Sequence, residues 1–182
     1  MSSLARVDQV IENKKKALEL KEKGNILFKK KKYDEAVWFA KEALGRRKDV
    51  RPVAAADTLN LIGRIYHKQA IAQDRDPSAQ KSLLDQAQEC LKEGLAIRRR
   101  LLTQNDPAIA QSYNTIAELL KDRNELEQAI EHFQKAYDVY SAGLGELHFR
   151  TSHPLGHLAE IAKADGRVKD ACDFLSRKVD IL

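Results

Sequence analysis

Apolar residues recur at helical spacing along much of the chain, in pairs of stretches separated by short polar segments. The clearest pair lies at about residues 109–137. Its first stretch has Ile109, Tyr113, Ile116, Ala117 and Leu120, and its second has Leu126, Ala129, Ile130, Phe133, Ala136 and Tyr137. The polar segment KDRNE separates the two stretches. Because apolar side chains three and four residues apart share one helix face, the pattern predicts a helix-turn-helix hairpin.

This pattern occurs four times, marked by a small residue in the first helix and an alanine in the second. The small residues are Gly24, Gly63, Ala117 and Ala159, and the alanines are Ala36, Ala87, Ala129 and Ala171. The two markers lie 12 residues apart, or 24 in the second segment, and from the third segment to the fourth both advance by 42. Two helices approach closely only where no large side chain intervenes. Since one hairpin cannot bury its apolar face alone, we expect the hairpins to stack.

The composition supports a helical fold. Eight Gly and four Pro in 182 residues are too few turn formers for a many-stranded sandwich or barrel. We predict an all-α fold, a right-handed α-solenoid of about four helix-turn-helix repeats in a single domain, residues 1–182. The units are expected at about 5–50, 51–104, 105–147 and 148–182, with an insertion at about 69–80. In the last unit, Gly166 is placed to close a helix in the left-handed conformation.

These segments resemble a known repeat family. KEKGNILFKKKKYDEAVWFAKEAL, residues 21–44, is similar to the first unit of a tetratricopeptide repeat (TPR) array. Residues 106–148 resemble the 42-residue repeats of kinesin light chains, and residues 144–171 continue them with Phe149 where proline is usual. The resemblance covers about residues 17–182. It implies a non-enzymatic scaffold or adaptor that binds a protein partner in motor–cargo, cytoskeletal or ciliary assemblies.

In such arrays the first helices of successive units line a concave face. Positions three before and one after each small residue lie on one side of the helix. We therefore expect a groove for an extended peptide or a partner's helix, lined by Lys21, Asn25, Asn60, Arg64, Lys68, Asn114 and Glu118. Asparagine amides can hold a peptide backbone, and the basic residues favour a partner with acidic segments. The fourth unit offers Gly156 and Glu160, but Gly156 and His157 replace asparagines common in the family, which argues against a groove function there.

The net charge of +5 is concentrated in the first quarter of the chain. Residues 1–50 contain fourteen Lys and Arg against eight Asp and Glu, whereas residues 51–182 contain eighteen against nineteen. An alternative function is therefore binding of RNA or another polyanion by the basic quarter. No aromatic residues alternate with the lysines to stack on bases, which argues against a nucleic-acid partner.

The sequence shows no chemistry that points to an enzyme. It contains no Gly-rich phosphate loop and no nucleophile elbow, so we expect neither catalytic residues nor a cofactor. His153 and His157 are four residues apart but have no evident third ligand, so no metal site is predicted. Cys90 and Cys172 are distant and show no CxxC pattern, so neither a disulfide nor a zinc site is expected.

Large aromatic side chains are expected in the interior. We expect Trp38 to pack between repeats. The repeat positions of four further aromatics predict core packing for Tyr33, Tyr66, Phe133 and Tyr137.

The two ends of the sequence carry further expectations. The N-terminus lacks the apolar stretch of a secretory signal, and no run approaches the ~20 apolar residues of a membrane helix, so a cytoplasmic, or cytoskeleton- or cilium-associated, location is predicted. The final segment, DACDFLSRKVDIL, is apolar on one side, and no polar capping helix follows it. We expect this helix to contact a second copy, a partner chain or a further segment. Self-assembly through the repeat edge is thus another alternative function.

Overall fold

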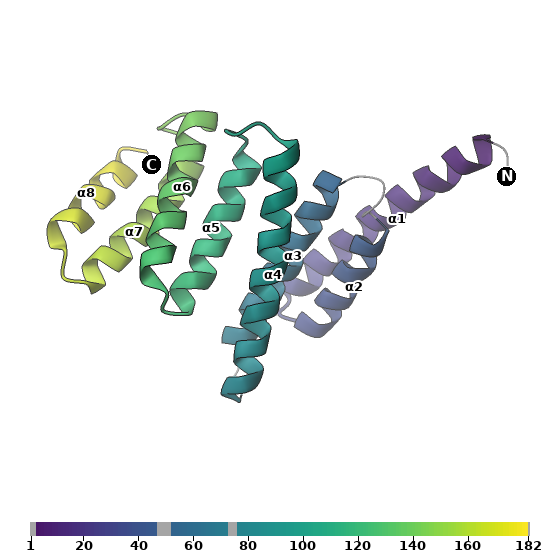
Figure 1. Cartoon of the computed structure of the whole chain (residues 1–182), viewed down its shortest axis with the longest axis horizontal. Coiled ribbons are helices and arrows are strands. Elements are labelled where there is room, and N and C mark those ends of the chain that lie inside the picture. The colour runs from purple at the N-terminus through teal and green to yellow at the C-terminus, as the bar shows by residue number, and fades with distance from the viewer. Residues whose placement is uncertain (1–2, 47–51, 73–75, 182) are drawn as a thin grey trace. The chain divides into compact units, whose positions relative to one another are not determined.

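The computed structural model describes residues 3–46, 52–72 and 76–181, and within these ranges it contains eight α-helices, one 3-10 helix and no strand (Figure 1). The predicted all-α fold class is confirmed. The α-helices are α1 (Ser3–Lys29), α2 (Tyr33–Gly45), α3 (Pro52–Ile71), α4 (Pro77–Leu101), α5 (Pro107–Asp122), α6 (Leu126–Leu144), α7 (Ser152–Ala164) and α8 (Val168–Val179), and the 3-10 helix is η1 (Phe149–Thr151).

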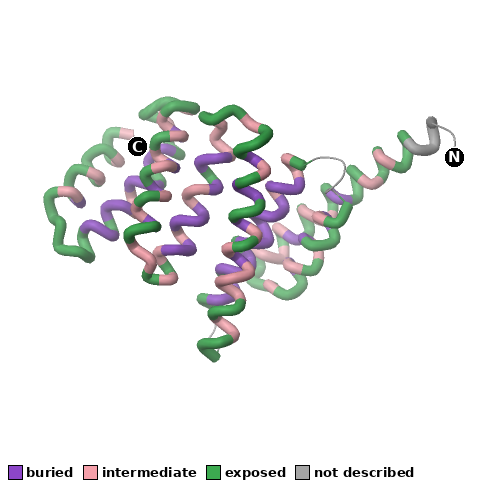
Figure 2. The backbone as a smooth tube through the Cα atoms, in the orientation of Figure 1, coloured by how far each residue is buried: buried purple, intermediate pink, exposed green. Residues whose placement is uncertain are grey.

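The chain divides into two compact units, Met1–Ile97 and Arg98–Leu182. The N-terminal unit contains α1, α2, α3 and most of α4, and the C-terminal unit contains the last turn of α4 and the helices that follow. Buried positions are concentrated on α3, α5 and α7, whereas α1 and α8 are largely exposed (Figure 2).

In the N-terminal unit, glycines allow paired helices to approach closely. A Cβ atom added at Gly24 would lie 3.2 Å from the carbonyl oxygen of Ala36. One added at Gly63 would lie 3.1 Å from the carbonyl oxygen of Ala87 and 2.6 Å from Cγ of Leu91. The marker residues that the repeat pattern pairs therefore do meet, including the second pair, despite its longer separation.

The segment at about 69–80, where an insertion is predicted, includes the end of one helix and the start of the next. Helix α3 continues to Ile71 and α4 begins at Pro77, while residues 73–75 lie outside the described residues. Pro77 suits the first position of a helix because its missing N–H would have no helical partner there. Asp76 precedes it and accepts hydrogen bonds from the hydroxyl and amide of Ser78 and from the amide of Ala79. These bonds, chiefly the hydroxyl one, lower the pKa of Asp76.

In the C-terminal unit, tight turns connect the helices of each pair. Asn124, between α5 and α6, and Gly166, between α7 and α8, have φ of 62° and 73°. The left-handed conformation predicted for Gly166 is confirmed. Buried Arg98 anchors the start of the unit, because its Nη1 donates hydrogen bonds of 2.7 Å to the carbonyl oxygen of Ala108 and to Oγ of Ser112.

The aromatic predictions hold in part. Phe133 and Tyr66 are buried, as expected, whereas Tyr33 and Tyr137 are half-buried. The prediction for Trp38 was wrong: its side chain is 57% exposed on α2 and contacts the edge of the neighbouring Phe39 ring. Amphipathic spacing does not locate the boundary between the buried and exposed sides of a short helix, and on α2 the buried residues are Ala36, Ala40 and Ala43.

Gly143 of α6 lies so close to the backbone of Asn105 that its replacement by alanine is expected to lower the stability of the protein. A methyl group at Gly143 would overlap the carbonyl oxygen of Asn105, in the loop before α5. We expect Gly143→Ala to lower the free energy of unfolding by about 2 kcal/mol, because a backbone atom must move despite the better helix propensity of alanine. Urea unfolding followed by far-UV circular dichroism measures this change.

Gly45→Ala is the matched control for Gly143→Ala. Gly45 also lies in a helix, but a Cβ atom there would meet nothing within 4 Å. We expect this variant to be unchanged or up to about 1 kcal/mol more stable. Equal effects of the two substitutions would contradict the proposed overlap at Gly143.

Candidate functional site

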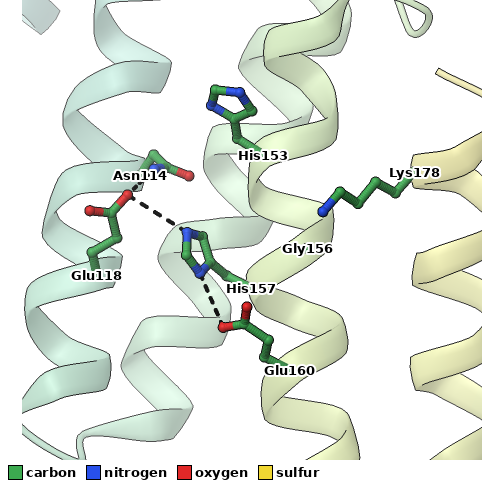
Figure 3. A pocket seen from close by; sticks show the side chains of 7 residues that line it. All are labelled: Asn114, Glu118, His153, Gly156, His157, Glu160 and Lys178. Carbon is green, nitrogen blue, oxygen red and sulfur yellow. Dashed lines mark hydrogen bonds and ion pairs between the residues drawn. The ribbon is translucent and has the colours of Figure 1, made fainter. Parts of the chain in front are cut away.

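The C-terminal unit contains a pocket of about 210 Å³ between α5, α7 and α8 (Figure 3). Seven residues line it: Asn114 and Glu118 from α5; His153, Gly156, His157 and Glu160 from α7; and Lys178 from α8. The α7 residues lie at intervals of three, one and three positions, which places them on one side of that helix. The pocket therefore joins one face of α5 to one face of α7.

The α5 wall presents an unsatisfied hydrogen-bond acceptor. Asn114 and Glu118 are one helical turn apart, and Nδ2 of Asn114 donates a hydrogen bond of 2.6 Å to Oε1 of Glu118. This bond orients the Asn114 amide. Its Oδ1 is buried and has no hydrogen-bond partner among the described residues. A buried acceptor without a partner carries a desolvation cost that a bound donor would remove.

His157 lies at the centre of the pocket and is held from three sides. Its ring stacks on the Phe133 ring, with centroids 4.7 Å apart and an angle of 19° between the planes. Nδ1 lies within hydrogen-bond distance of Nζ of Lys121, at 3.3 Å. Nε2 faces Oε1 of Glu118 at 3.7 Å. The same Glu118 oxygen is thus shared by His157 and Asn114.

Charges of both signs surround this histidine. Lys121 Nζ lies 3.0 Å from Oε2 of Glu160, and that oxygen is 3.5 Å from Nδ1 of His157. The hydrogen bond from Lys121 is the main cause of the lowered pKa of Glu160. The acidic and basic groups near the pocket therefore balance, and the pocket can receive a ligand with both a donor and an acceptor.

Lys178 reaches the pocket because Gly156 has no side chain. A Cβ atom at Gly156 would lie 3.0 Å from Nζ of Lys178 and 3.6 Å from its Cε. The lysine therefore extends from α8 to the backbone of α7 at Gly156, as Figure 3 shows. The ammonium group can donate hydrogen bonds to a carboxylate or carbonyl oxygen.

The sequence prediction identified part of this pocket. It named Asn114 and Glu118, which the structure brings together with the fourth-unit positions Gly156 and Glu160. It missed His153, His157 and Lys178 as lining residues, and it argued against a groove at Gly156 and His157. The three-and-four spacing of the α7 residues was a usable signal. Nothing in the sequence pairs Lys178 with Gly156.

The predicted groove residues of the N-terminal unit lie on α1 and α3. Lys21 Nζ is 3.9 Å from Oδ2 of Asp57, and the Arg64 guanidinium lies over the Phe28 ring at 5.4 Å. Lys68 is exposed and Asn25 is half-buried. Asn60 is only 5% exposed, and its amide nitrogen has no hydrogen-bond partner among the described residues. Binding of a peptide by these five residues stays a prediction.

Other kinds of site are not evident in the described ranges. No cluster of three or more His, Cys, Asp or Glu side chains is arranged to hold a metal ion in residues 3–46, 52–72 and 76–181. Over the same part of the chain, none of the helices is both long and apolar enough to cross a membrane.

Comparison with known proteins places the chain among helical repeats. The family model of the tetratricopeptide repeat matches residues 79–142. The fold is similar to BtubC (BKLC) from P. vanneervenii, with a TM-score of 0.73 and 17% identity over 100% of this chain and 74% of that one. It is also similar to TPR-like repeats named for a kinesin light chain of Podosopora anserina, with a TM-score of 0.70 and 17% identity over 90% of this chain and 73% of the other.

A third similar structure is aspartyl phosphate phosphatase F from Bacillus subtilis. Its TM-score is 0.76, with 16% identity over 98% of this chain and 43% of that protein. None of the curated protein sequences matches the chain. At these identities the structural likenesses concern the fold alone. The predicted resemblance is nevertheless confirmed: residues 79–142 match the tetratricopeptide repeat model, and the fold is similar to that of TPR-like repeats.

Proposed function

We propose that the chain is a non-enzymatic scaffold that binds an extended peptide of a partner protein, with the α5–α7 pocket as a binding position. Tetratricopeptide repeats are commonly protein–protein interaction scaffolds. The observation that carries the proposal is the buried, unpartnered Oδ1 of Asn114. A backbone N–H of a peptide would supply the missing donor. On the opposite side, Lys178 would bind a carbonyl or acidic side chain of the same peptide.

The proposed setting rests on the kinesin-light-chain-like fold. Repeats of that kind suit an adaptor in motor–cargo, cytoskeletal or ciliary assemblies of the cytoplasm. The likeness to these repeats identifies no partner. The chemistry of the pocket indicates the kind of peptide to look for: an extended segment with a free backbone N–H beside an acidic or carbonyl-bearing residue.

Two substitutions in the pocket test the proposal. The probes are peptides selected from an arrayed library on the unmodified protein. We expect Asn114→Ala to weaken their binding by about tenfold, because one hydrogen bond in a desolvated site is lost. We expect Gly156→Ala to weaken binding as well, because its methyl group displaces Lys178. Alanine also stabilises the middle of a helix relative to glycine by about 1 kcal/mol. A loss of binding in that variant therefore cannot be attributed to unfolding.

Gln134→Ala on α6 is the matched control, since Gln134 is exposed and hydrogen-bonded to Asp138 away from the pocket. Its affinity should equal that of the unmodified protein. If selected peptides bind all three variants equally well, the pocket is not the binding position. Asn60→Ala then tests the groove residues predicted for the N-terminal unit.

The exposed lysines of α1 and the following turn support a second candidate, binding of a polyanion. Lys14, Lys15 and Lys16 are exposed, as are residues 29–32, all lysines. This candidate predicts that affinity for single-stranded RNA falls steeply with salt, because counterions are released on binding. Peptide binding that persists where RNA binding is lost would favour the scaffold.

A further inference from the structure

The outer side of α8 carries an apolar stripe, which we define as Val168, Cys172, Leu175 and Val179. Val168, Leu175 and Val179 are 67%, 47% and 70% exposed, and Cys172 is also exposed. Another side of the helix is used internally, because Ala171 is buried and α8 packs against α7. The intervals of four, three and four residues in the stripe are those of a seam between two packed helices. Helix α8 thus has two apolar sides. One packs against α7, and the other, the stripe, has no packing partner among the described residues.

The charges beside the stripe suit antiparallel pairing with an identical helix. Lys169 and Asp180 are exposed, and neither forms an ion pair within residues 3–46, 52–72 and 76–181. Eleven residues separate them, about three helical turns, so they lie on the same side of the stripe at opposite ends. When two such helices run antiparallel, each lysine faces the aspartate of the other helix.

We propose that α8 is a self-association surface that pairs antiparallel with α8 of a second copy of this chain. In this register Val168 lies opposite Val179 of the other copy, and Cys172 lies opposite Leu175. Lys169 reaches Asp180 of the other copy, and the two-fold axis repeats this ion pair. Lys178 extends into the pocket of its own chain and not toward the second copy, so it brings no like charge to Lys169 there.

A second copy is the occupant that fits the stripe. Both charges of the proposed ion pair, Lys169 and Asp180, flank the stripe of one chain, so two identical helices are complementary to each other. The stripe is short, and two helices of this length bury less area than a stable protein interface of about 1,200–2,000 Å². We therefore infer a weak dimer that forms at high concentration. The proposal is independent of peptide binding, since Lys178 is the one α8 residue among those that line the pocket.

Sedimentation equilibrium between about 10 and 500 μM tests for this weak dimer. We expect the mean mass to rise with concentration toward that of a dimer. Leu175→Glu should raise the dissociation constant at least about tenfold, because it places a charge within the apolar seam. Leu147→Glu is the matched control, since Leu147 is 74% exposed and lies outside α8. It should leave the dissociation constant unchanged.

Charge reversal tests the antiparallel register. Lys169→Glu alone should weaken the dimer about fivefold, because a glutamate would then face Asp180 of the other copy at both ends. Adding Asp180→Lys to that variant should restore the dimer. Within one helix the two positions are about 16 Å apart, so rescue requires contact between copies.

Cross-linking of Cys172 gives a direct measure of proximity. In the proposed register the two Cys172 residues are offset by only about 4.5 Å along the helix axis. A short bismaleimide should yield a covalent dimer, which Cys172→Ser abolishes. Cys90 is half-buried and its burial raises the pKa of its thiol, which slows its reaction.

Three results would overturn the proposal. A monomer at every concentration would show that no second copy occupies the stripe. A dimer that tolerates Leu175→Glu would place the interface elsewhere. Failure of Asp180→Lys to rescue Lys169→Glu would exclude the antiparallel register.

Discussion

Replacement of Gly63 by valine is expected to lower the free energy of unfolding of the N-terminal unit by about 3 kcal/mol. A Cβ atom at this position would already lie 2.6 Å from Cγ of Leu91 and 3.1 Å from the carbonyl oxygen of Ala87. The two γ-methyl groups of valine add to this overlap in the closest part of the α3–α4 contact. Because one of the obstructing atoms belongs to the backbone, the helices must separate.

The tryptophan fluorescence reports this loss, because Trp38 is the single tryptophan and lies on α2 of the same unit. Urea unfolding should show a lower midpoint with an unchanged slope. Gly45→Val provides the matched control, since a Cβ atom at Gly45 meets nothing within 4 Å. A Gly63→Val midpoint equal to that of the control would refute the close helix approach.

Phe133→Ala is expected to destabilise the C-terminal unit by about 4 kcal/mol. Phe133 is the largest fully buried side chain among the described residues, so its removal loses transfer free energy and leaves a cavity. Far-UV circular dichroism in urea measures the change. Phe149→Ala is the control, because Phe149 is exposed, and it should cost less than about 0.5 kcal/mol. Comparable losses in the two variants would contradict this account of the core.

Phe133 also links the core to the pocket, since its ring supports that of His157. Phe133→Leu retains most of the apolar volume and should cost far less stability than alanine. It removes the aromatic face, however, so the imidazole resonance of His157 should lose the ring-current shift of a stacked pair. An unchanged His157 resonance in Phe133→Leu would show that the two rings are not stacked in solution.

The pocket illustrates how far sequence reasoning extends. Asn114 and Glu118 were identified because they are four residues apart, and a helix places such residues on one face. The hydrogen bond between them follows from that local geometry. The burial of Oδ1 of Asn114 does not follow from the spacing of residues within α5.

Lys178 and Gly143 make contacts that could not be predicted from the sequence. Turns and crossings of whole helices bring Lys178 against Gly156, and they bring Gly143 against Asn105. No spacing rule within one helix relates Lys178 to Gly156, or Gly143 to Asn105. The exposure of Trp38 on α2 likewise did not follow from the spacing of apolar residues.

The amino-acid sequence by itself determined the helical hairpins, the small residues at which their helices meet, and the left-handed turn at Gly166, because these depend on local periodicity and backbone freedom. The tertiary structure alone decided that His157 stacks on Phe133, that Lys178 reaches Gly156 and that one side of α8 is exposed among the described residues. These features arise from the packing of separate helices, and their distances depend on crossings that local sequence does not encode.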